Sequence, residues 1–597
     1  MGALAKNKVL LVAVAVLVVV ALVVGGILVT RPPEERQEVA EKPEPVDEVP
    51  VVKEAPLEEV ELNEFGWAVP EETIVITDFM GEGFGSVEGT PIRGDQDLFD
   101  EFARPLHEFL LEHFNVDYRR TVRPGVMDEN LRLMLATGDY PEVIAWMSDA
   151  LAEEFIAQGR AVELTPYIEE YGPNITRRLG EQLDLLRTGD GKLYKLPVNW
   201  GVTPNPAGWD FAVRHDWWKE AGLPLYRTPE EFYEVLKDLM ERHPYNELGE
   251  KVYALSDNSN GRNLLGAMLG AYGFVDGFRV NEATGTFTHW INTDEGLEIA
   301  RYINRFYREG MIDPDFIINT WEDWNAMVTG HRIIGNIGIW WHTFVAGHEA
   351  WGRMYGAGLP VEQRFMNVSV AAPDVERDTL ITYNFLGDAR AIITDKAVEN
   401  NNVANIMKWW NWEMTELAHF IVTHGPPHPD NVWNIENGKW MFHEKTFDAL
   451  TKLQYYHEVR DRFGGRAFWT LAAGGIIEHE NIDPRITRVS GWDFWPIAPD
   501  GEFLDPGVRI SWGYSNAQPF DTSLFTVTWR AGDPITVTNA TITDTIVSEW
   551  AEIITSPTEA AMEERFMEAR ERLNELGVPD LEEFRAEVYR ANREKLN

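Results

Sequence analysis

The chain of 597 residues carries 97 Asp and Glu against 53 Lys and Arg, a formal net charge of −44 at pH 7. This acidity argues against nucleic acid or anionic lipid as a partner of the surface as a whole, although a local basic pocket is compatible with it. Cysteine is absent, which excludes disulfides, thiolate metal sites, cysteine nucleophiles and a lipid anchor on cysteine. Hydrophobic residues at 44% indicate a globular protein with a large core, with room for two or three domains.

The N-terminus predicts a membrane anchor. Residues 9–29 form an uninterrupted apolar run preceded by Lys6 and Lys8. About 20 such residues span a bilayer, whereas the apolar part of a cleaved signal peptide has about 7–15. We therefore expect residues 1–30 to be a transmembrane signal anchor, with a cleaved signal peptide as the alternative. Residues 31–70, rich in Pro, Glu and Val, predict a disordered tether.

Residues 71–205 predict the first of two α/β lobes within a globular part that spans 71–597. Buried strands are expected at 73–77, at 116–122 and from 143, with helices at 97–114 and 128–137. This alternation indicates a parallel sheet with right-handed crossovers. The glycine-rich loop after the first strand has no G-x-G-x-x-G register, so a dinucleotide site is not indicated.

The segment 189–223 predicts the crossing to the second lobe. Pro197, Pro204 and Pro206 forbid a regular helix and keep the chain extended, and a short helix then ends at Gly222. The second lobe is expected at 206–379 with parts of 426–597, and 380–425 belong to the first. Helices are predicted from Thr228 in a capping box with Glu231, at 293–310, at 403–417, at 556–576 with Ser556 opening a capping box, and from 580. A short strand is expected within 330–341, connections at 368–373 and 382–394, and core positions at Trp409, Trp410 and Trp412.

Several motifs occur in an order that resembles a known family. They are LATGDYPEVI at 135–144, DGKLYKLP at 190–197, YINRFYREGMIDP at 302–314 and IIT at 553–555. Together they resemble the extracellular solute-binding proteins of ABC importers, in the large group that includes sugar and oligosaccharide binders. The resemblance covers the chain from about residue 73 to the C-terminus.

The resemblance implies a two-lobed periplasmic-binding-protein-like fold with a hinge and an interlobe cleft. It implies an extracytoplasmic binding component that captures a carbohydrate, most readily an oligosaccharide, by hinge closure and delivers it to the permease subunits of an ABC transporter. Such a protein is no enzyme, needs no cofactor, and is expected as a monomer on the extracellular face of the membrane.

The 23 Trp residues favour a sugar ligand, because indole faces pack on the C–H faces of sugar rings while Asp and Asn bind the hydroxyls. For each Trp, a place in the core is the alternative. Candidate ligand-binding residues lie where crossing and strand-end loops should face the cleft: Asp78, Trp146, Asn199, Trp200, Asn205, Trp209, Trp340, Trp341, Asn384, Trp495 and Trp512. No EF-hand spacing is present, and the loop 424–430, with two His and one Asp, favours a proline-rich turn over a metal site.

Two other functions remain open. A secreted, membrane-anchored polysaccharide-degrading enzyme would share the aromatic residues and the acidity, and needs two carboxylates about 5–10 Å apart. The chain has no G-x-S-x-G or H-E-x-x-H motif and no repeat of eight βα units, and a hydrolase gives no reason for the ordered motifs above, which disfavours this enzyme. A peptide-binding or sensory version of the same fold would differ in its ligand or partner.

Overall fold

The structure is a computed structural model that describes most of residues 61–596. The ranges outside the description are 1–60, 89, 199, 201–208, 225, 340–364, 369, 374, 376–381, 384–385, 388, 448–451, 473–475, 478, 491–493, 497–519, 531 and 597. The predicted anchor at 1–30 and most of the predicted tether therefore lie outside the described residues. Among the helices that are described, none is both long and apolar enough to cross a bilayer.

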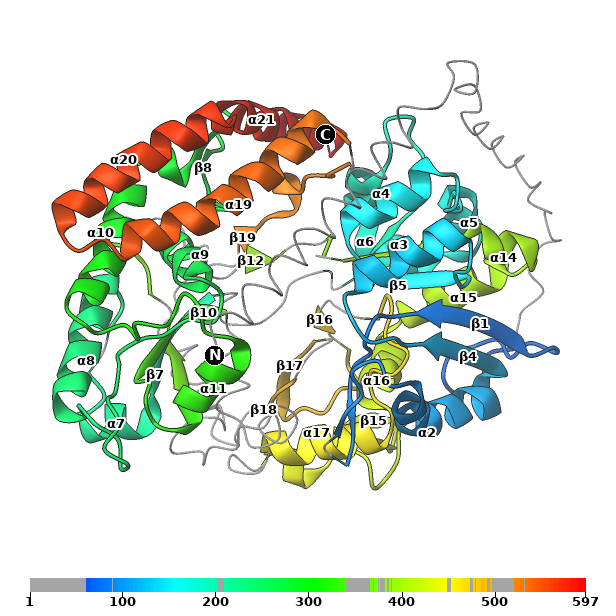
Figure 1. Cartoon of the computed structure of the whole chain (residues 1–597). Coiled ribbons are helices and arrows are strands. Elements are labelled where there is room, and N and C mark those ends of the chain that lie inside the picture. Colours follow the sequence, from blue (N-terminus) through cyan, green and yellow to red (C-terminus); the bar gives the residue numbers. More distant parts are fainter. Residues whose placement is uncertain are drawn as a thin grey trace, which may run out of the picture. The chain divides into compact units, whose positions relative to one another are not determined.

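A five-stranded mixed sheet in the order β4-β1-β5-β13-β6 forms the centre of the first lobe (Figure 1). Its strands are β1 (Ile74–Phe79), β4 (Val116–Thr121), β5 (Val143–Met147), β6 (Leu196–Val198) and β13 (Ala389–Ile393). β1 runs parallel to β4 and β5, which confirms the three predicted strands and their direction. β13 lies antiparallel between β5 and β6, so the chain returns to this sheet within the predicted connection at 382–394.

Helices pack around this sheet and bury their apolar faces in two hydrophobic clusters, a large one and a smaller one that takes in α3 and α4. They are α2 (Gln96–Phe114), α3 (Met127–Thr137), α4 (Asp149–Ala157), α5 (Thr165–Tyr171), α6 (Pro173–Leu179), the 3-10 helix η2 (Gly180–Leu186), α14 (Asp395–Glu399), α15 (Val403–Glu413) and α16 (Glu416–His424). The Asp95 side chain caps α2, and α3 ends at Gly138 in the left-handed region, as its sequence predicts. Trp409, Trp410 and Trp412 are buried in the core, which confirms that prediction.

The first lobe extends beyond residue 425. The added elements are the hairpin β14 (Trp433–Glu436) and β15 (Lys439–Phe442), the 3-10 helix η5 (Glu444–Phe447) and α17 (Lys452–Arg462). Residues from this part, up to Ala472, share the cluster of the first sheet. Small sheets of β2 (Ser86–Val87) with β3 (Thr90–Pro91), and of β16 (Ile476–Ile477), β17 (Ile486–Ser490) and β18 (Phe494–Pro496), complete the description here.

The predicted tether is too long at its C-terminal end. Phe65 and Trp67 are each only 5% exposed and belong to the first-lobe core. The Trp67 indole Nε1 donates a hydrogen bond to the Phe114 carbonyl at 2.9 Å, at the end of α2. The composition of 31–70 as a whole predicts disorder, but these two aromatic side chains bury enough apolar surface to hold their own segment on the lobe.

The second lobe has its own hydrophobic cluster around the antiparallel sheet β10-β7-β11. Its elements are β7 (Trp209–Arg214), α7 (His215–Glu220), α8 (Pro229–Arg242), α9 (Arg262–Ala271), β8 (Phe278–Asn281), β9 (Thr286–His289), the 3-10 helix η3 (Trp290–Asn292), α10 (Asp294–Arg308), α11 (Trp321–Thr329), β10 (Gly335–Ile339) and β11 (Phe365–Val368). The capping box of Thr228 and Glu231 is present, and Thr293 caps α10. β7, which directly precedes α7, was not predicted from the proline-rich crossing.

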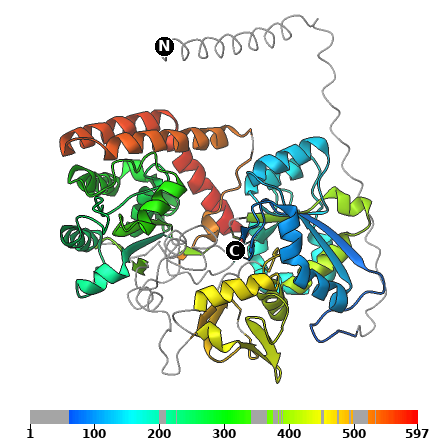
Figure 2. The same cartoon turned by 60° about the horizontal axis from the view of Figure 1, so that its bottom comes forward.

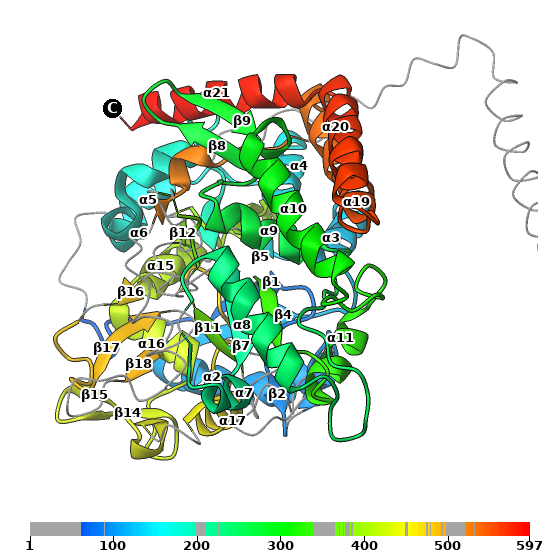
Figure 3. The same cartoon turned by 90° about the vertical axis from the view of Figure 1, so that its left-hand side faces the viewer.

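Three long helices at the C-terminus pack against this lobe (Figures 2 and 3). They are α19 (Pro534–Ile554), α20 (Glu559–Glu575) and α21 (Val578–Lys595), preceded by β12 (Thr382–Tyr383) paired with β19 (Phe520–Asp521) and by the 3-10 helix η6 (Ser523–Phe525). The predicted cap at Ser556 is wrong. Thr558, in extended backbone, accepts from the Ala561 N–H, whereas the Ser556 hydroxyl donates back to Glu552 O at the end of α19.

Candidate ligand-binding site

The carboxyl ends of β1 and β5 carry two of the predicted ligand residues. Asp78 is the second-last residue of β1 and Trp146 the second-last residue of β5. Ligands of open α/β sheets characteristically bind outside the carboxyl ends of parallel strands. We therefore expect a ligand-binding site at this edge of the first-lobe sheet.

Trp146, Phe84 and Trp469 form an aromatic cluster at this edge. The Trp146 ring centroid lies 5.4 Å from that of Trp469 and 5.2 Å from that of Phe84. Trp469 is fully buried, whereas Trp146 and Phe84 are only partly buried. The backbone of Trp146 has φ of 64°, a conformation that a bulky residue rarely adopts. Such local strain is characteristic of functional positions.

A buried ion pair lies beneath the cluster. The Arg120 guanidinium contacts the Asp78 carboxylate in a close pair, with Nε to Oδ2 at 2.8 Å, and the Tyr118 hydroxyl donates to the same oxygen at 2.8 Å. Burial raises the pKa of the Asp78 carboxyl, against the opposing effect of the Arg120 charge. Arg120 also donates to the carbonyl oxygens of Ala467 and Trp469, at 2.9 and 3.2 Å.

A second buried carboxylate, Glu413, holds the residues that follow Trp469. Its Oε2 accepts from the Leu471 N–H at 3.0 Å and from the Thr470 hydroxyl, and its Oε1 accepts from the Trp409 indole at 3.2 Å. Burial raises the pKa of Glu413 to about 7. Through these hydrogen bonds the Glu413 side chain fixes the position of residues 470–471.

Two indole N–H groups complete the support of the 467–471 segment. Trp146 Nε1 donates to the Trp469 carbonyl at 3.0 Å, and Trp200 Nε1 donates to the Leu471 carbonyl at 2.8 Å. Of the residues selected from the sequence, Trp146 and Trp200 thus bond this segment directly, and Asp78 bonds Arg120, which donates to it. Asp78 and Trp200 are buried, whereas the Trp146 ring is partly exposed.

The structure does not describe the side chains of the other predicted ligand residues. Asn199, Asn205, Trp340, Trp341, Asn384 and Trp512 lie outside the described residues, and Trp209 and Trp495 are described only as backbone in β7 and β18. Their part in binding stays a prediction.

Sequence reasoning missed Arg120, Glu413, Arg466 and Trp469. The Arg466 guanidinium lies 5.6 Å from the Trp469 ring and 6.0 Å from the Phe84 ring. A signal was present for Glu413, which stands four residues after Trp409 on the buried face of a Trp-rich helix. The other three follow from long-range packing and have no local signature.

The histidine- and proline-containing loop forms a tight turn. Asn431 Nδ2 donates to the carbonyl oxygens of His424 and Pro426, at 3.0 and 2.7 Å, and His424 Nδ1 lies 2.7 Å from the Tyr456 hydroxyl. In the part of the chain that the structure describes, no group of three or more His, Asp or Glu side chains is arranged to hold a metal ion.

Sequence comparisons give a consistent result. Residues 112–310 match the profile of the family described as bacterial extracellular solute-binding protein. The lipoprotein LipO of Bacillus subtilis is 24% identical over 213 residues, and the polygalacturonan/rhamnogalacturonan-binding protein YtcQ of the same organism is 23% identical over 203. These matches cover 34% and 33% of this chain and 39% of the length of each relative.

Solved structures share the fold over most of the chain. The alginate-binding protein AlgQ2 aligns with a TM-score of 0.55 at 16% identity, covering 88% of this chain and 99% of its own. The substrate-binding protein FusA of the S. pneumoniae ABC transporter, in complex with kestose, aligns with a TM-score of 0.60 at 15% identity, covering 87% and 99%. Residues 112–310 are thus similar to bacterial extracellular solute-binding proteins, and the chain as a whole shares the fold of solved solute-binding proteins.

Proposed function

We propose that the protein is the extracytoplasmic binding component of an ABC importer, and that it captures an oligosaccharide between its lobes and delivers it to a membrane permease. The observation that carries this proposal is the Trp146 ring, partly exposed at the carboxyl end of β5 and fixed in place by Phe84, Trp469 and its own hydrogen bond. A sugar ring that stacks on it meets a surface that is already ordered, so little rotamer entropy is lost on binding.

The comparisons support a carbohydrate over a peptide. Among the proteins named above, YtcQ is described as binding polygalacturonan or rhamnogalacturonan and AlgQ2 as binding alginate, and FusA was solved in complex with kestose. In this proposal the second wall of the cleft comes from Trp209, Trp340, Trp341 and the other predicted residues. Closure of the lobes on the sugar then produces the form that the permease recognises.

We further propose that the chain stands on the extracellular face of the membrane as a monomer. The apolar run at 9–29 supports an anchor within residues 1–30, and the composition of 31–60 supports a flexible tether. The tether ends near Asn63, whose side chain donates to the His113 carbonyl on the first lobe.

Binding without chemistry fits the carboxylates of the site. Asp78 and Glu413 are both buried, and they hold Arg120, Thr470 and the 471 N–H rather than facing a substrate. A glycosidase needs one carboxyl as acid and another as base or nucleophile at the scissile bond. This pair serves as support for the aromatic cluster.

The test is thermal unfolding of the purified full chain against a panel of oligosaccharides and peptides, with each sugar recovered and analysed for cleavage. A ligand at about 100 times its dissociation constant adds roughly 2.7 kcal/mol to the free energy of unfolding. We expect a shift with an intact oligosaccharide, its loss in Trp146→Ala, and its partial retention in Trp146→Phe.

Trp321→Ala, on α11 in the second lobe, is the matched control for removal of a partly buried indole and should keep the shift. Shortened sugar products would replace the binding function by a hydrolase. A shift with peptides alone would reassign the ligand class.

A further inference from the structure

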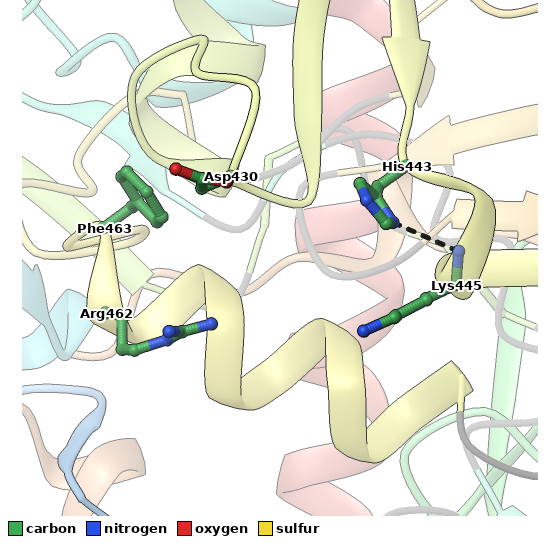
Figure 4. Close-up of a pocket in the computed structure, with 5 residues that line it drawn as sticks. All are labelled: Asp430, His443, Lys445, Arg462 and Phe463. Carbon is green, nitrogen blue, oxygen red and sulfur yellow. Dashed lines mark hydrogen bonds between the residues drawn. The ribbon is translucent and has the colours of Figure 1, made fainter.

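A pocket of about 450 Å³ lies beside the C-terminal end of α17 (Figure 4). It is lined by Asp430, His443, Lys445, Arg462 and Phe463. Asp430 lies in the turn after α16, His443 directly follows β15, and Lys445 lies in η5. Arg462 is the last residue of α17, and Phe463 follows it. In Figure 4 the Arg462 and Lys445 side chains extend toward each other in front of the α17 ribbon.

The chemistry of this pocket differs from that of the chain as a whole. Two basic side chains, Arg462 and Lys445, line it in a protein whose formal charge is −44. Arg462 is exposed at the end of α17 and forms no ion pair within the described residues. A basic pocket in such an acidic chain concentrates attraction for an anion at one place.

The rim of the pocket is held by short contacts. The Phe463 ring lies 5.2 Å from the His428 ring, and a side chain at Gly425 would stand 2.7 Å from the Phe463 carbonyl oxygen. His443 N donates to the Val432 carbonyl at 2.9 Å. His443 Nδ1 accepts from the Lys445 N–H at 3.2 Å, which leaves the proton of the neutral ring on Nε2.

We propose that this pocket binds the carboxylate of a uronic acid unit in an acidic oligosaccharide. The Arg462 guanidinium can pair with a carboxylate through two parallel hydrogen bonds, and Lys445 supplies a second positive charge. Phe463 offers an apolar face to the sugar ring, and Asp430 can accept from hydroxyl groups. The proposal rests on the proposed sugar-binding function in one respect: that function is the reason to expect the carboxylate on a sugar.

The Phe463 ring favours a carboxylate carried on a sugar over free phosphate, because its apolar face can pack against a sugar ring and gains nothing from an inorganic ion. Arg462 and Phe463 line the pocket, and Trp469 of the aromatic cluster follows a few residues later in the sequence.

Calorimetric titration of the full chain tests the proposal with three probes: trigalacturonate, a neutral galactose trisaccharide and inorganic phosphate. We expect trigalacturonate to bind wild type and to weaken about tenfold or more in the double variant Arg462→Gln/Lys445→Gln, since each lost contact is a charged hydrogen bond. Arg462→Lys, which keeps the charge and loses the planar fork, should fall between them. Lys219→Gln, an exposed cation on α7, is the matched control and should bind as wild type does.

Equal trigalacturonate affinity in wild type and the double variant would overturn the pocket and leave the proposed function standing. Phosphate that binds as tightly as trigalacturonate, with the same loss in the double variant, would overturn the sugar assignment in favour of a free anion. Failure of wild type to bind trigalacturonate would also overturn the proposal, and the neutral trisaccharide then shows whether sugar binding itself survives.

Discussion

The carboxylate of Asp78 and the guanidinium of Arg120 are both completely buried, so each depends on the other for its charge. We expect Asp78→Asn to lower the free energy of unfolding by about 3–5 kcal/mol, because Arg120 would be left as an uncompensated buried cation. Urea titration of the full chain measures the change. Glu154→Gln, which breaks the pair with the exposed Arg132, should cost no more than about 1 kcal/mol. Equal costs for the two variants would contradict the structural role of the buried pair.

Glu413 predicts a pH dependence with a definite sign. Its pKa in the folded protein is raised to about 7 from an ordinary 4.5. Between these values the folded state keeps a proton that the unfolded state has lost, so the contribution of Glu413 to stability falls as pH rises from about 4.5 to 7. Glu413→Gln carries no such proton. Relative to wild type, the variant should therefore gain roughly 1–3 kcal/mol in the free energy of unfolding between pH 5 and pH 8.

The measurement is urea titration of both proteins at pH 5, 6, 7 and 8. Glu112→Gln, an exposed carboxylate on α2, is the control and should show no such trend. A difference between Glu413→Gln and wild type that is constant over this range would show that Glu413 titrates as an ordinary carboxyl.

The segment at 63–67 is an element that the tether prediction overlooked. Trp67 is 5% exposed, contacts the Trp409 and Trp412 rings and donates to the end of α2. We expect Trp67→Ala to cost about 3–5 kcal/mol of stability, as other large core truncations do. Val69→Ala, at a position that is 50% exposed, should change stability by less than about 0.5 kcal/mol. Near-equal thermal midpoints for the two variants would return residues 61–70 to the tether.

Local signals predicted the elements well where start, stop and period agree. The strands β1, β4 and β5 follow from short apolar runs. The helices α2, α8 and α10 follow from apolar periodicity bounded by recognisable caps, and all six elements are present. The prediction failed where two neighbouring residues suit the same role. Ser556 and Thr558 both suit a cap, and what distinguishes them is that α19 extends to Ile554 and uses the Ser556 hydroxyl.

The candidate site shows the same division. The positions of Asp78 and Trp146 could be predicted because strand ends are visible in sequence and ligands gather there. The structural role of Asp78 could not be predicted, because its partner Arg120 lies on β4 and the carbonyl oxygens that accept from Arg120 lie in the 467–471 segment. Burial of a charge is decided by the tertiary fold, and no local pattern reports it.

The two largest hydrophobic clusters among the described residues are each built from stretches of chain that alternate in sequence. The first takes in Phe65 to Trp200 and Leu386 to Ala472, and the second takes in Phe211 to Val370 and Phe525 to Tyr589. Each lobe therefore needs residues from both halves of the sequence before its core is complete. Proteins with such long-range contacts pay loop-closure entropy early and fold slowly.

The net negative charge lowers the stability of the molecule as a whole. A formal charge of −44 repels itself across the folded surface, and screening falls from a Debye length of about 30 Å at 0.01 M salt to about 8 Å at 0.15 M. We expect the thermal midpoint of the full chain to rise by several degrees over this range, because relief of net repulsion outweighs the weakening of surface pairs that are worth little individually. Sodium, potassium and tetramethylammonium chloride at equal ionic strength should act alike if screening is the cause. A rise with one cation alone would indicate a bound ion instead, and a fall with all three would show that the surface ion pairs outweigh the net repulsion.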